Sequence, residues 1–314
     1  MVAAVSGTGA RRIHTLAITG GTGFVGAHLM RIARDEGYEL RALTRGWKPP
    51  EDDVVWVDGA LDRADSLAKL AAGADAVVHV AGLINGSAAA FERVNVAGTA
   101  AMIDAARRAG VRRFVHVSSL AAREPALSAY GRSKARSERL VAASGLDWTI
   151  IRPPAVYGPG DRETLELFRM ARRGLVALPP RGRFSLIHVE DLARLVLAVL
   201  DAPDSLAETY EPDDGREDGW EHRHFARTLG RLFDRRTATI ALPRPVLAAA
   251  AAADRLVRRG EAKLTPDRVR YFCHPDWVVS AARRPPAALW QPAVATPAGL
   301  RATADWYRAQ GWLR

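Results

Sequence analysis

The chain has 314 residues, of which 48% are hydrophobic, and it carries a formal net charge of +10. This length suits one large α/β domain, or a domain of about 200 residues with a smaller appendage. The single cysteine, Cys273, excludes an internal disulfide framework, and no apolar stretch approaches the roughly 18 residues that span a bilayer.

The positive charge comes from arginine, because only four of the 45 basic residues are lysines. Arginine doublets are spread along the chain, without a dense basic block containing aromatics or a zinc-finger pattern. Abundant arginine beside abundant alanine is what a GC-rich coding bias produces. We therefore expect no nucleic-acid partner and no metal site, while contact with an anionic membrane surface stays open.

Residues 1–12 precede the first strand pattern and are expected to form an N-terminal extension. They contain Arg11-Arg12 but no apolar run before a cleavage-like site, so a signal peptide is not expected. Together with the single cysteine, this predicts a cytoplasmic protein, and peripheral contact with the inner face of the membrane stays open.

From residue 13 to 203, short β-rich runs alternate with helical patterns. The expected strands are Leu16–Thr19, Glu39–Thr44, Val54–Val57, Ala76–Val80, Phe114–Ser118, Trp148–Ile151 and Phe184–His188. The expected helices are Phe24–Glu36, Ser66–Ala72, Ala89–Ala109, Ser128–Ser144, Arg162–Arg173 and Glu190–Leu200. Several strands are almost continuously apolar, as parallel strands buried on both faces are. The alternation predicts an α/β fold with a doubly wound parallel sheet, a Rossmann domain over residues 13–203.

The segment between the first strand and the first helix is rich in glycine. Gly21, Gly23 and Gly26 match the spacing G-x-G-x-x-G, and Gly20 adds a second match. Residues without Cβ allow a tight turn and close approach to a pyrophosphate, while the helix N-terminus offers N–H groups to that anion. The loop is expected to bind a dinucleotide through Gly20, Gly21, Thr22, Gly23, Phe24, Val25 and Gly26.

The end of the second strand indicates which dinucleotide is bound. NAD-binding folds place a carboxylate there to accept from the ribose 2′-hydroxyl, but this chain has none, and Arg45 could pair with a 2′-phosphate. We therefore favour NADP(H), with NAD(H) left open if Arg45 stacks on adenine or faces solvent. Asp58 is expected to cap a turn or contact the adenine amino group. Ala81 and Gly82 leave room beside the adenosine and ribose.

The candidate catalytic residues follow in the middle of the domain. Tyr130 and Lys134 are four residues apart in a helical pattern, so their side chains share one face. A nearby ammonium and a cationic nicotinamide favour the phenolate, which would lower the pKa of Tyr130 and let it transfer a proton near neutral pH. Lys134 could also bind the ribose hydroxyls, and Ser119 would donate to the substrate oxygen. A surface Tyr–Lys pair is the ordinary alternative.

After residue 203 the alternation ends, and residues 204–314 are predicted to form a smaller, mostly helical substrate-binding cap. Helical patterns cover residues 220–233, 246–259 and 266–271. The stretch 245–259, with Trp220, Phe225, Trp277 and Trp290, could form an apolar rim with basic residues that lies on an anionic bilayer. Ordinary packing of an amphipathic helix on the core is the favoured alternative.

Taken together, these motifs resemble an extended or atypical short-chain dehydrogenase/reductase of the NAD-dependent epimerase/dehydratase superfamily. The resembling segments are Thr19–Gly26, Val78–Gly82, Val94–Thr99, Val117–Ser119, Tyr130–Lys134, Arg152–Gly160 and Ile187–Asp191. The resemblance implies a catalytic triad of Ser119, Tyr130 and Lys134. It also implies that the loop containing Pro153 and Val156 meets the nicotinamide carboxamide. Asn95 and the segment 188–191 are expected to be structural, with Asp191 as a helix cap.

Departures from the family narrow the substrate. Many nucleotide-sugar enzymes carry an asparagine where Pro154 or Ala155 stands here, and no extra acid or base suggests dehydration. The loop resembles hydroxysteroid-dehydrogenase-like and complex I accessory-like members, and Asp305–Leu313 resembles bacterial members linked to hopanoid or ceramide pathways. The resemblance thus predicts an NADPH-dependent oxidoreductase that interconverts a ketone and a secondary alcohol on a small hydrophobic molecule, such as an oxidised ceramide, a keto-sphingolipid or a hydroxysteroid-like alcohol.

Two alternatives remain open at this point. One is a nucleotide-sugar epimerase that retains NAD tightly, and the other is a non-catalytic NADPH-binding accessory subunit. The helices over 89–109 and 128–144 could also form the four-helix homodimer interface common in this family.

Overall fold

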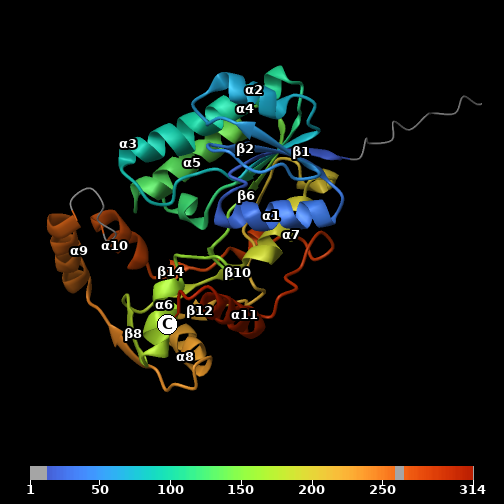
Figure 1. Cartoon of the computed structure of the whole chain (residues 1–314). Helices are drawn as coiled ribbons and strands as arrows, with labels where there is room; N and C mark the ends of the chain where they lie inside the picture. The colour runs from blue at the N-terminus through green and yellow to red at the C-terminus, as the bar shows by residue number, and fades with distance from the viewer. Residues whose placement is uncertain (1–12, 259–264, 314) are drawn as a thin grey trace, which may run out of the picture.

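The computed structural model describes residues 13–258 and 265–313, and its main feature is a seven-stranded parallel sheet (Figure 1). The strands are β1 (Thr15–Thr19), β2 (Glu39–Thr44), β3 (Val54–Asp58), β4 (Ala76–His79), β5 (Arg113–Val117), β6 (Asp147–Ile151) and β11 (Glu208–Tyr210). They lie in the order β11-β6-β5-β4-β1-β2-β3. This confirms the predicted Rossmann fold. The predicted extension, residues 1–12, lies outside the described residues.

Helices cover both faces of the sheet (Figure 1). On one face lie α1 (Phe24–Asp35) and α7 (Val189–Ala198), and on the other lie α2 (Ala64–Ala71), α4 (Gly98–Arg108) and α5 (Ala129–Ala142). Strand residues alternate between these faces: Leu16 and Ile18 are buried against the α1 side, and Ala17 is buried against the α2 side. Both faces being apolar explains why the strands read as continuous hydrophobic runs.

One predicted helix is built from three pieces. The segment expected over 89–109 consists of α3 (Ala88–Phe91), a π-helical turn (Glu92–Ala97) and α4. Such turns are rare and are found mostly at functional sites. This one contains Asn95.

The strand order reverses direction between β1 and β4, which are neighbours in the sheet. In doubly wound sheets the ligand crevice opens at this switch point, beyond the carboxyl ends of the strands. At the amino ends of the strands, the guanidinium of Arg113 is buried, and burial lowers its pKa to about 10. At 2.6–3.0 Å it donates to the carbonyls of Asp147, Val199 and Leu200 and to the hydroxyls of Thr149 and Ser205.

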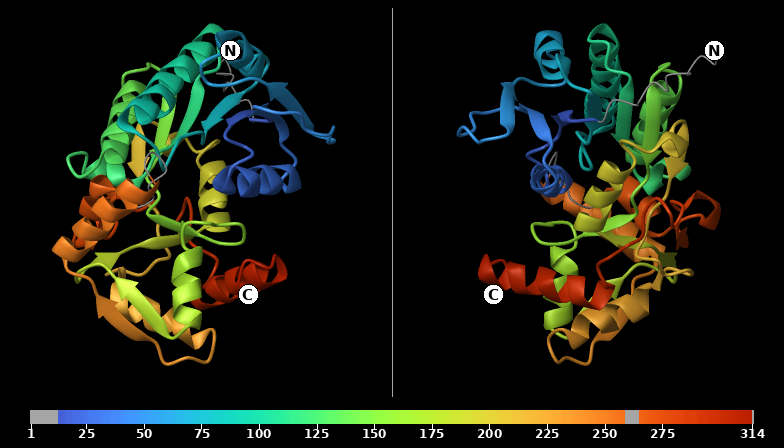
Figure 2. Two further views of the ribbon diagram at one scale, coloured as in Figure 1. Left: turned by 60° about the vertical axis from the view of Figure 1, so that its left-hand side comes forward. Right: turned by 90° about the vertical axis from the view of Figure 1, so that its right-hand side faces the viewer.

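A second lobe lies beyond the carboxyl edge of the sheet (Figure 2). Its elements are α6 (Leu165–Arg172), β8 (Leu175–Leu178), β9 (Arg183–Phe184), β12 (Trp220–Glu221), α8 (His222–Arg231), β13 (Ala238–Ala241), α9 (Arg244–Arg258), α10 (Pro266–Phe272), β14 (Asp276–Trp277) and α11 (Thr296–Ala309). Between the lobes, β7 (Ala155–Tyr157) pairs with β10 (Leu186–His188). The lobe has its own core, which includes Phe168, Leu229 and Tyr307.

The predicted boundary at residue 203, between the Rossmann domain and the cap, stays a prediction. The elements themselves cross it, because α6 and β8 pack in the core of the second lobe while β11 joins the main sheet. The strand expected over 184–188 is split into β9 and β10, and neither belongs to that sheet. The homodimer through α4 and α5 stays a prediction as well.

The predicted apolar rim of the cap is wrong in its aromatic members. Trp220, Phe225 and Trp277 are buried inside the second lobe, and Trp290 packs against the sheet core, where its indole donates to Asp191 O (3.1 Å). Arg259 lies outside the described residues. Within residues 13–258 and 265–313, none of the helices is both long enough and apolar enough to span a bilayer.

Candidate active site

The glycine loop lies at the carboxyl end of β1, and two of its glycines leave no room for a side chain. A Cβ on Gly20, whose φ is +76°, would lie 2.7 Å from Ala81 N, and one on Gly26 would lie 2.0 Å from Gly20 O. The turn closes where Gly23 N donates to Gly20 O (3.0 Å). Because no side chain caps the start of α1 at Gly23, its first amide groups remain for an anion.

The residues expected beside the adenosine lie at the same edge of the sheet. Asp58, the last residue of β3, pairs with Thr44, the last residue of β2. Arg45 therefore follows β2 directly beside Asp58. The side chain of Arg45 is exposed, and Asp58 forms an ion pair with Arg63 (3.8 Å). Ala81 N donates to the hydroxyl of Thr19 (3.3 Å), which holds the segment after β4 against the glycine loop.

The three candidate catalytic residues converge at the carboxyl end of β5. Ser119 follows that strand and is hydrogen-bonded to Tyr130, in the first turn of α5. Lys134 follows one turn later and is buried, and its Nζ donates to Val117 O (3.0 Å). A Cβ on Gly82 would lie 3.3 Å from Lys134 Nζ, so the ammonium also faces the segment expected beneath the ribose.

The pKa values correct one expectation. The pKa of Tyr130 is raised, because burial disfavours the phenolate and the charge of Glu163 repels it, while the hydrogen bond from Ser119 acts in the opposite direction. The lowering that the sequence suggested is therefore absent in the protein by itself. Burial also lowers the pKa of Lys134 to about 8, opposed by the nearby carboxylate of Glu138.

A buried ionic network fixes α5 against the ends of two strands. Glu138 accepts two hydrogen bonds from Arg152 (2.9 and 2.7 Å) and one from Ser118 Oγ (2.5 Å), and Arg152 also contacts Glu211 (3.3 Å). Sequence reasoning missed Glu138, although it lies four residues after Lys134 and the spacing that linked Tyr130 to Lys134 also predicts it.

The loop after β6 lies next to the residue that follows Ser119. Pro153 is buried, and its carbonyl accepts from the amide of Leu120 (2.9 Å), the residue after Ser119. Val156, in β7, is partly buried against the sheet core. The contact of either residue with a nicotinamide stays a prediction.

Asn95 positions the backbone of the loop that follows β4. Its side chain accepts from Leu83 N (2.7 Å) and donates to Leu83 O (3.0 Å) and to Ser133 Oγ (2.9 Å). These bonds give the π-helical turn a structural task next to Lys134. The cap assigned to Asp191 is wrong: its carboxylate accepts from the amides of Ala293 and Val294 (2.9 and 3.1 Å).

Helix α10 of the second lobe closes over the start of α5. Asp267 accepts from the amide of Ala129 (2.8 Å), next to Tyr130. Tyr271, on the same helix, has a pKa raised by burial and further by its closeness to Tyr130. No local signal in the sequence predicts Tyr271, because it is brought to the site by the fold of the whole lobe.

A polar bridge joins three segments beside Tyr130. Glu163 accepts from Asn85 Nδ2 (3.2 Å), in the loop after β4, and from Arg268 Nη2 (2.9 Å), in α10. Among residues 13–258 and 265–313, no group of three or more His, Cys, Asp or Glu side chains is placed to hold a metal ion. The groups that the site offers at the cofactor edge are the hydroxyl of Ser119, the phenol of Tyr130 and the ammonium of Lys134.

The sequence of the chain is similar to those of known proteins. The model of the NAD dependent epimerase/dehydratase family matches residues 16–211. The ceramide reductase of Caulobacter vibrioides is 40% identical, with 95% of this chain and 96% of that protein covered. The sterol demethylase protein B of Methylococcus capsulatus is 33% identical over 60% of this chain and 66% of its own length.

Solved structures share the fold. The crystal structure of gox2253 has a TM-score of 0.76 at 22% identity and covers 96% of this chain and 100% of its own. MoeE5 in complex with UDP-glucose and NAD has a TM-score of 0.73 at 22% identity, with 95% and 99% covered. The family match spans the sheet, the glycine loop and the candidate triad, which confirms the resemblance: the chain belongs to the NAD dependent epimerase/dehydratase family, as an NAD(P)-dependent enzyme of the extended short-chain dehydrogenase/reductase type.

Proposed function

We propose that the chain is an NADPH-linked oxidoreductase that interconverts a ketone and a secondary alcohol on a hydrophobic, lipid-like substrate such as an oxidised ceramide. The observation that carries the proposal is that Ser119 and Tyr130 lie together beside the buried Lys134, at the cofactor edge of the sheet. The 40% identity to a ceramide reductase, over nearly the full length of both chains, supports the substrate class.

The residues at the switch point fit a dinucleotide. Glycines that cannot carry a Cβ bring the loop backbone close to the uncapped N-terminus of α1, which suits a pyrophosphate. The exposed Arg45 at the end of β2 supports NADP(H), because a guanidinium can bind a 2′-phosphate through two hydrogen bonds. When bound, the nicotinamide exchanges hydride with the carbonyl carbon.

The triad then has a distinct task for each residue. Ser119 donates to the substrate oxygen and holds it against Tyr130, whose phenol hands its proton to that oxygen during reduction and takes it back during oxidation. At neutral pH the raised pKa keeps Tyr130 protonated, as a proton donor requires. Lys134 binds the ribose hydroxyls, and its positive charge supports the phenolate that remains.

The surroundings of the triad support a hydrophobic substrate. Leu120, directly after Ser119, packs with Trp277 and Val279 of the second lobe, and Leu127 and Tyr271 lie against this cluster. Because Leu120, Trp277 and Val279 are buried against one another, an acyl or sphingoid chain near the reacting carbonyl would contact the partly buried Leu127 and Tyr271.

Turnover of an oxidised ceramide with NADPH, measured for the wild type and for Tyr130→Phe, tests the proposal. Removing the phenol should lower turnover by about 10² or more while leaving NADPH affinity nearly unchanged, since general acid catalysis contributes about 10²–10⁴. The matched control is Tyr210→Phe, which removes a phenol from β11, and it should keep wild-type turnover. Unchanged turnover in Tyr130→Phe would refute the triad.

A cofactor titration separates the alternatives. Exchangeable NADPH, bound more tightly than NADH, agrees with a reductase that releases its cofactor in each cycle. Tightly retained NAD with turnover of nucleotide sugars would instead identify an epimerase. NADPH binding without turnover of any ketone would point to an accessory subunit.

A further inference from the structure

A two-stranded ribbon in the second lobe exposes an apolar face. Strands β8 and β13 pair in parallel, with Leu175 opposite Ala238 and Ala177 opposite Ile240. These four side chains share the outer face, while Val176 and Leu178 are buried on the inner one. Leu175 is 46% exposed and Ile240 is 50% exposed. Because they are paired across the ribbon, the two belong to one exposed apolar patch.

Helix α9 follows β13 and exposes further apolar side chains. Val246, in its first turn, is 49% exposed. The helix packs on α10 through Leu247 and Ala251, and its other alanines from 248 to 253 are exposed. We call the ribbon face formed by Leu175, Ala177, Ala238 and Ile240 the apolar strip.

Arginines border the strip at one end. The doublets Arg172-Arg173 and Arg235-Arg236 precede β8 and β13, and they are neighbours in space because Ala238 N donates to Gly174 O (2.9 Å). All four side chains are exposed, and none forms an ion pair within residues 13–258 and 265–313. Residues 167–183 contain five arginines and residues 235–253 contain three, and neither stretch contains an aspartate or glutamate.

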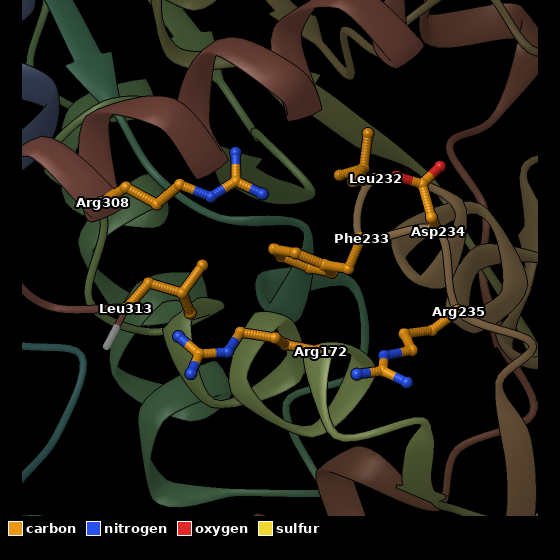
Figure 3. Close-up of a pocket in the computed structure, with 7 residues that line it drawn as sticks. All are labelled: Arg172, Leu232, Phe233, Asp234, Arg235, Arg308 and Leu313. Atoms are coloured by element: carbon orange, nitrogen blue, oxygen red, sulfur yellow. The ribbon is translucent and has the colours of Figure 1, made fainter.

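A hollow of about 440 Å³ adjoins the arginines (Figure 3). Arg172, Arg235 and Arg308 come to it from α6, the turn after α8 and α11, around the ring of Phe233. Leu232, Leu313 and the exposed carboxylate of Asp234 complete the lining. Arg308 is paired with Asp305 (2.6 Å), so Arg172 and Arg235 are the guanidinium groups that suit a phosphate attached to a hydrocarbon chain.

We propose that this face docks the enzyme on an anionic phospholipid bilayer. The apolar strip enters the interface, and the arginines pair with lipid phosphates, which are the two attractions that hold a protein at a membrane surface. A lipid surface is favoured over a second copy of the chain, because the two arginine doublets at the end of the strip are complementary to anionic headgroups, which pair with the guanidinium groups while leaving them hydrated. The inference does not depend on which ketone is reduced, because vesicle binding is measured without turnover.

Co-sedimentation of the full chain with vesicles tests the proposal. The protein should bind vesicles of phosphatidylcholine mixed with phosphatidylglycerol. Binding should weaken when salt is added, and it should be weaker on vesicles made of phosphatidylcholine alone. The double variant Arg172→Ala/Arg235→Ala should weaken partitioning onto vesicles about thirtyfold, because each basic residue at the surface contributes about a factor of five. Leu175→Ser/Ile240→Ser should weaken it about tenfold.

Two matched controls keep the result specific. Arg107→Ala/Arg108→Ala removes the same charge from the exposed end of α4, and Val55→Ser removes an exposed apolar side chain from β3; both should bind as the wild type does. Equal losses in the controls, or no binding to anionic vesicles, would overturn the proposal. So would a dimer of the wild type that Leu175→Ser/Ile240→Ser converts to a monomer, because the strip would then cover a second copy.

Discussion

The buried Lys134 should lower the stability of the fold for the benefit of the reaction. Its pKa falls from 10.5 to about 8, because burial disfavours the ammonium. The unfolded chain therefore binds more protons than the folded one between these two values, and stability rises with pH across that range. At about 1.36 kcal/mol per pKa unit, an ammonium at pH 7 costs the fold about 3 kcal/mol, and less than about 1 kcal/mol of this remains at pH 10.

The substitution Lys134→Met removes this cost together with one hydrogen bond. The variant loses the bond to Val117 O, which contributes about 1 kcal/mol or somewhat more, so we expect it to be about 1–2 kcal/mol more stable than the wild type at pH 7. The difference should change by about 2.5 kcal/mol between pH 7 and pH 10, so at pH 10 the variant should be about 1 kcal/mol less stable than the wild type. Turnover should be almost lost, because methionine can neither stabilise the phenolate of Tyr130 nor bind the ribose hydroxyls.

Urea unfolding, followed by circular dichroism at pH 7 and pH 10, measures both quantities. The control is Lys69→Met, which replaces an exposed lysine in α2. Its free energy of unfolding should differ from that of the wild type by the same amount at pH 7 and at pH 10. A Lys134→Met difference that does not change with pH would refute the reasoning, since it would mean that Lys134 is not buried as an ammonium.

Three further changes test other parts of the structure. Arg45→Ala should weaken NADPH and spare NADH in a binding titration, and equal weakening of both would contradict the 2′-phosphate role. Arg113→Met should lower the free energy of unfolding by about 3–5 kcal/mol in urea, because buried acceptors lose their donor, and a loss below about 1 kcal/mol would show that they find other partners. Gly26→Ala should weaken cofactor binding, because its Cβ would lie 2.0 Å from Gly20 O, and unchanged NADPH affinity would contradict the role of the loop.

Local patterns predicted the main sheet well, while the candidate triad stays a prediction. Six of the seven strands of the main sheet, and the helices between them, follow from apolar runs and 3.6-residue periodicity, since each pattern reflects burial within one element. The spacing of Tyr130 and Lys134 predicted a shared helix face for the same reason. The seventh strand, β11, was missed because it is three residues long and joins the sheet only through β6.

Contacts between distant segments could not be predicted in this way. Tyr271 and Asp267 reach the start of α5 from more than a hundred residues away, and nothing near them in the sequence marks that contact. The sequence left open an apolar rim that contained the tryptophans of the cap, although packing on the core was favoured, because composition alone does not tell a core from a rim. The raised pKa of Tyr130 depends on burial and on Glu163, and both are properties of the assembled site.

The buried Arg113 has a consequence for synthesis on the ribosome. Its side chain lies in the fifth strand, but three of its acceptors, Val199, Leu200 and Ser205, are made about ninety residues later. Until they leave the exit tunnel, the sheet would have to enclose a charged group without its acceptors, which is costly. Nascent chains that end before residue 199 should therefore keep the β5–β6 edge open, and the nucleotide-binding half should close as a unit only after Ser205, about two thirds of the way along the chain, has left the exit tunnel.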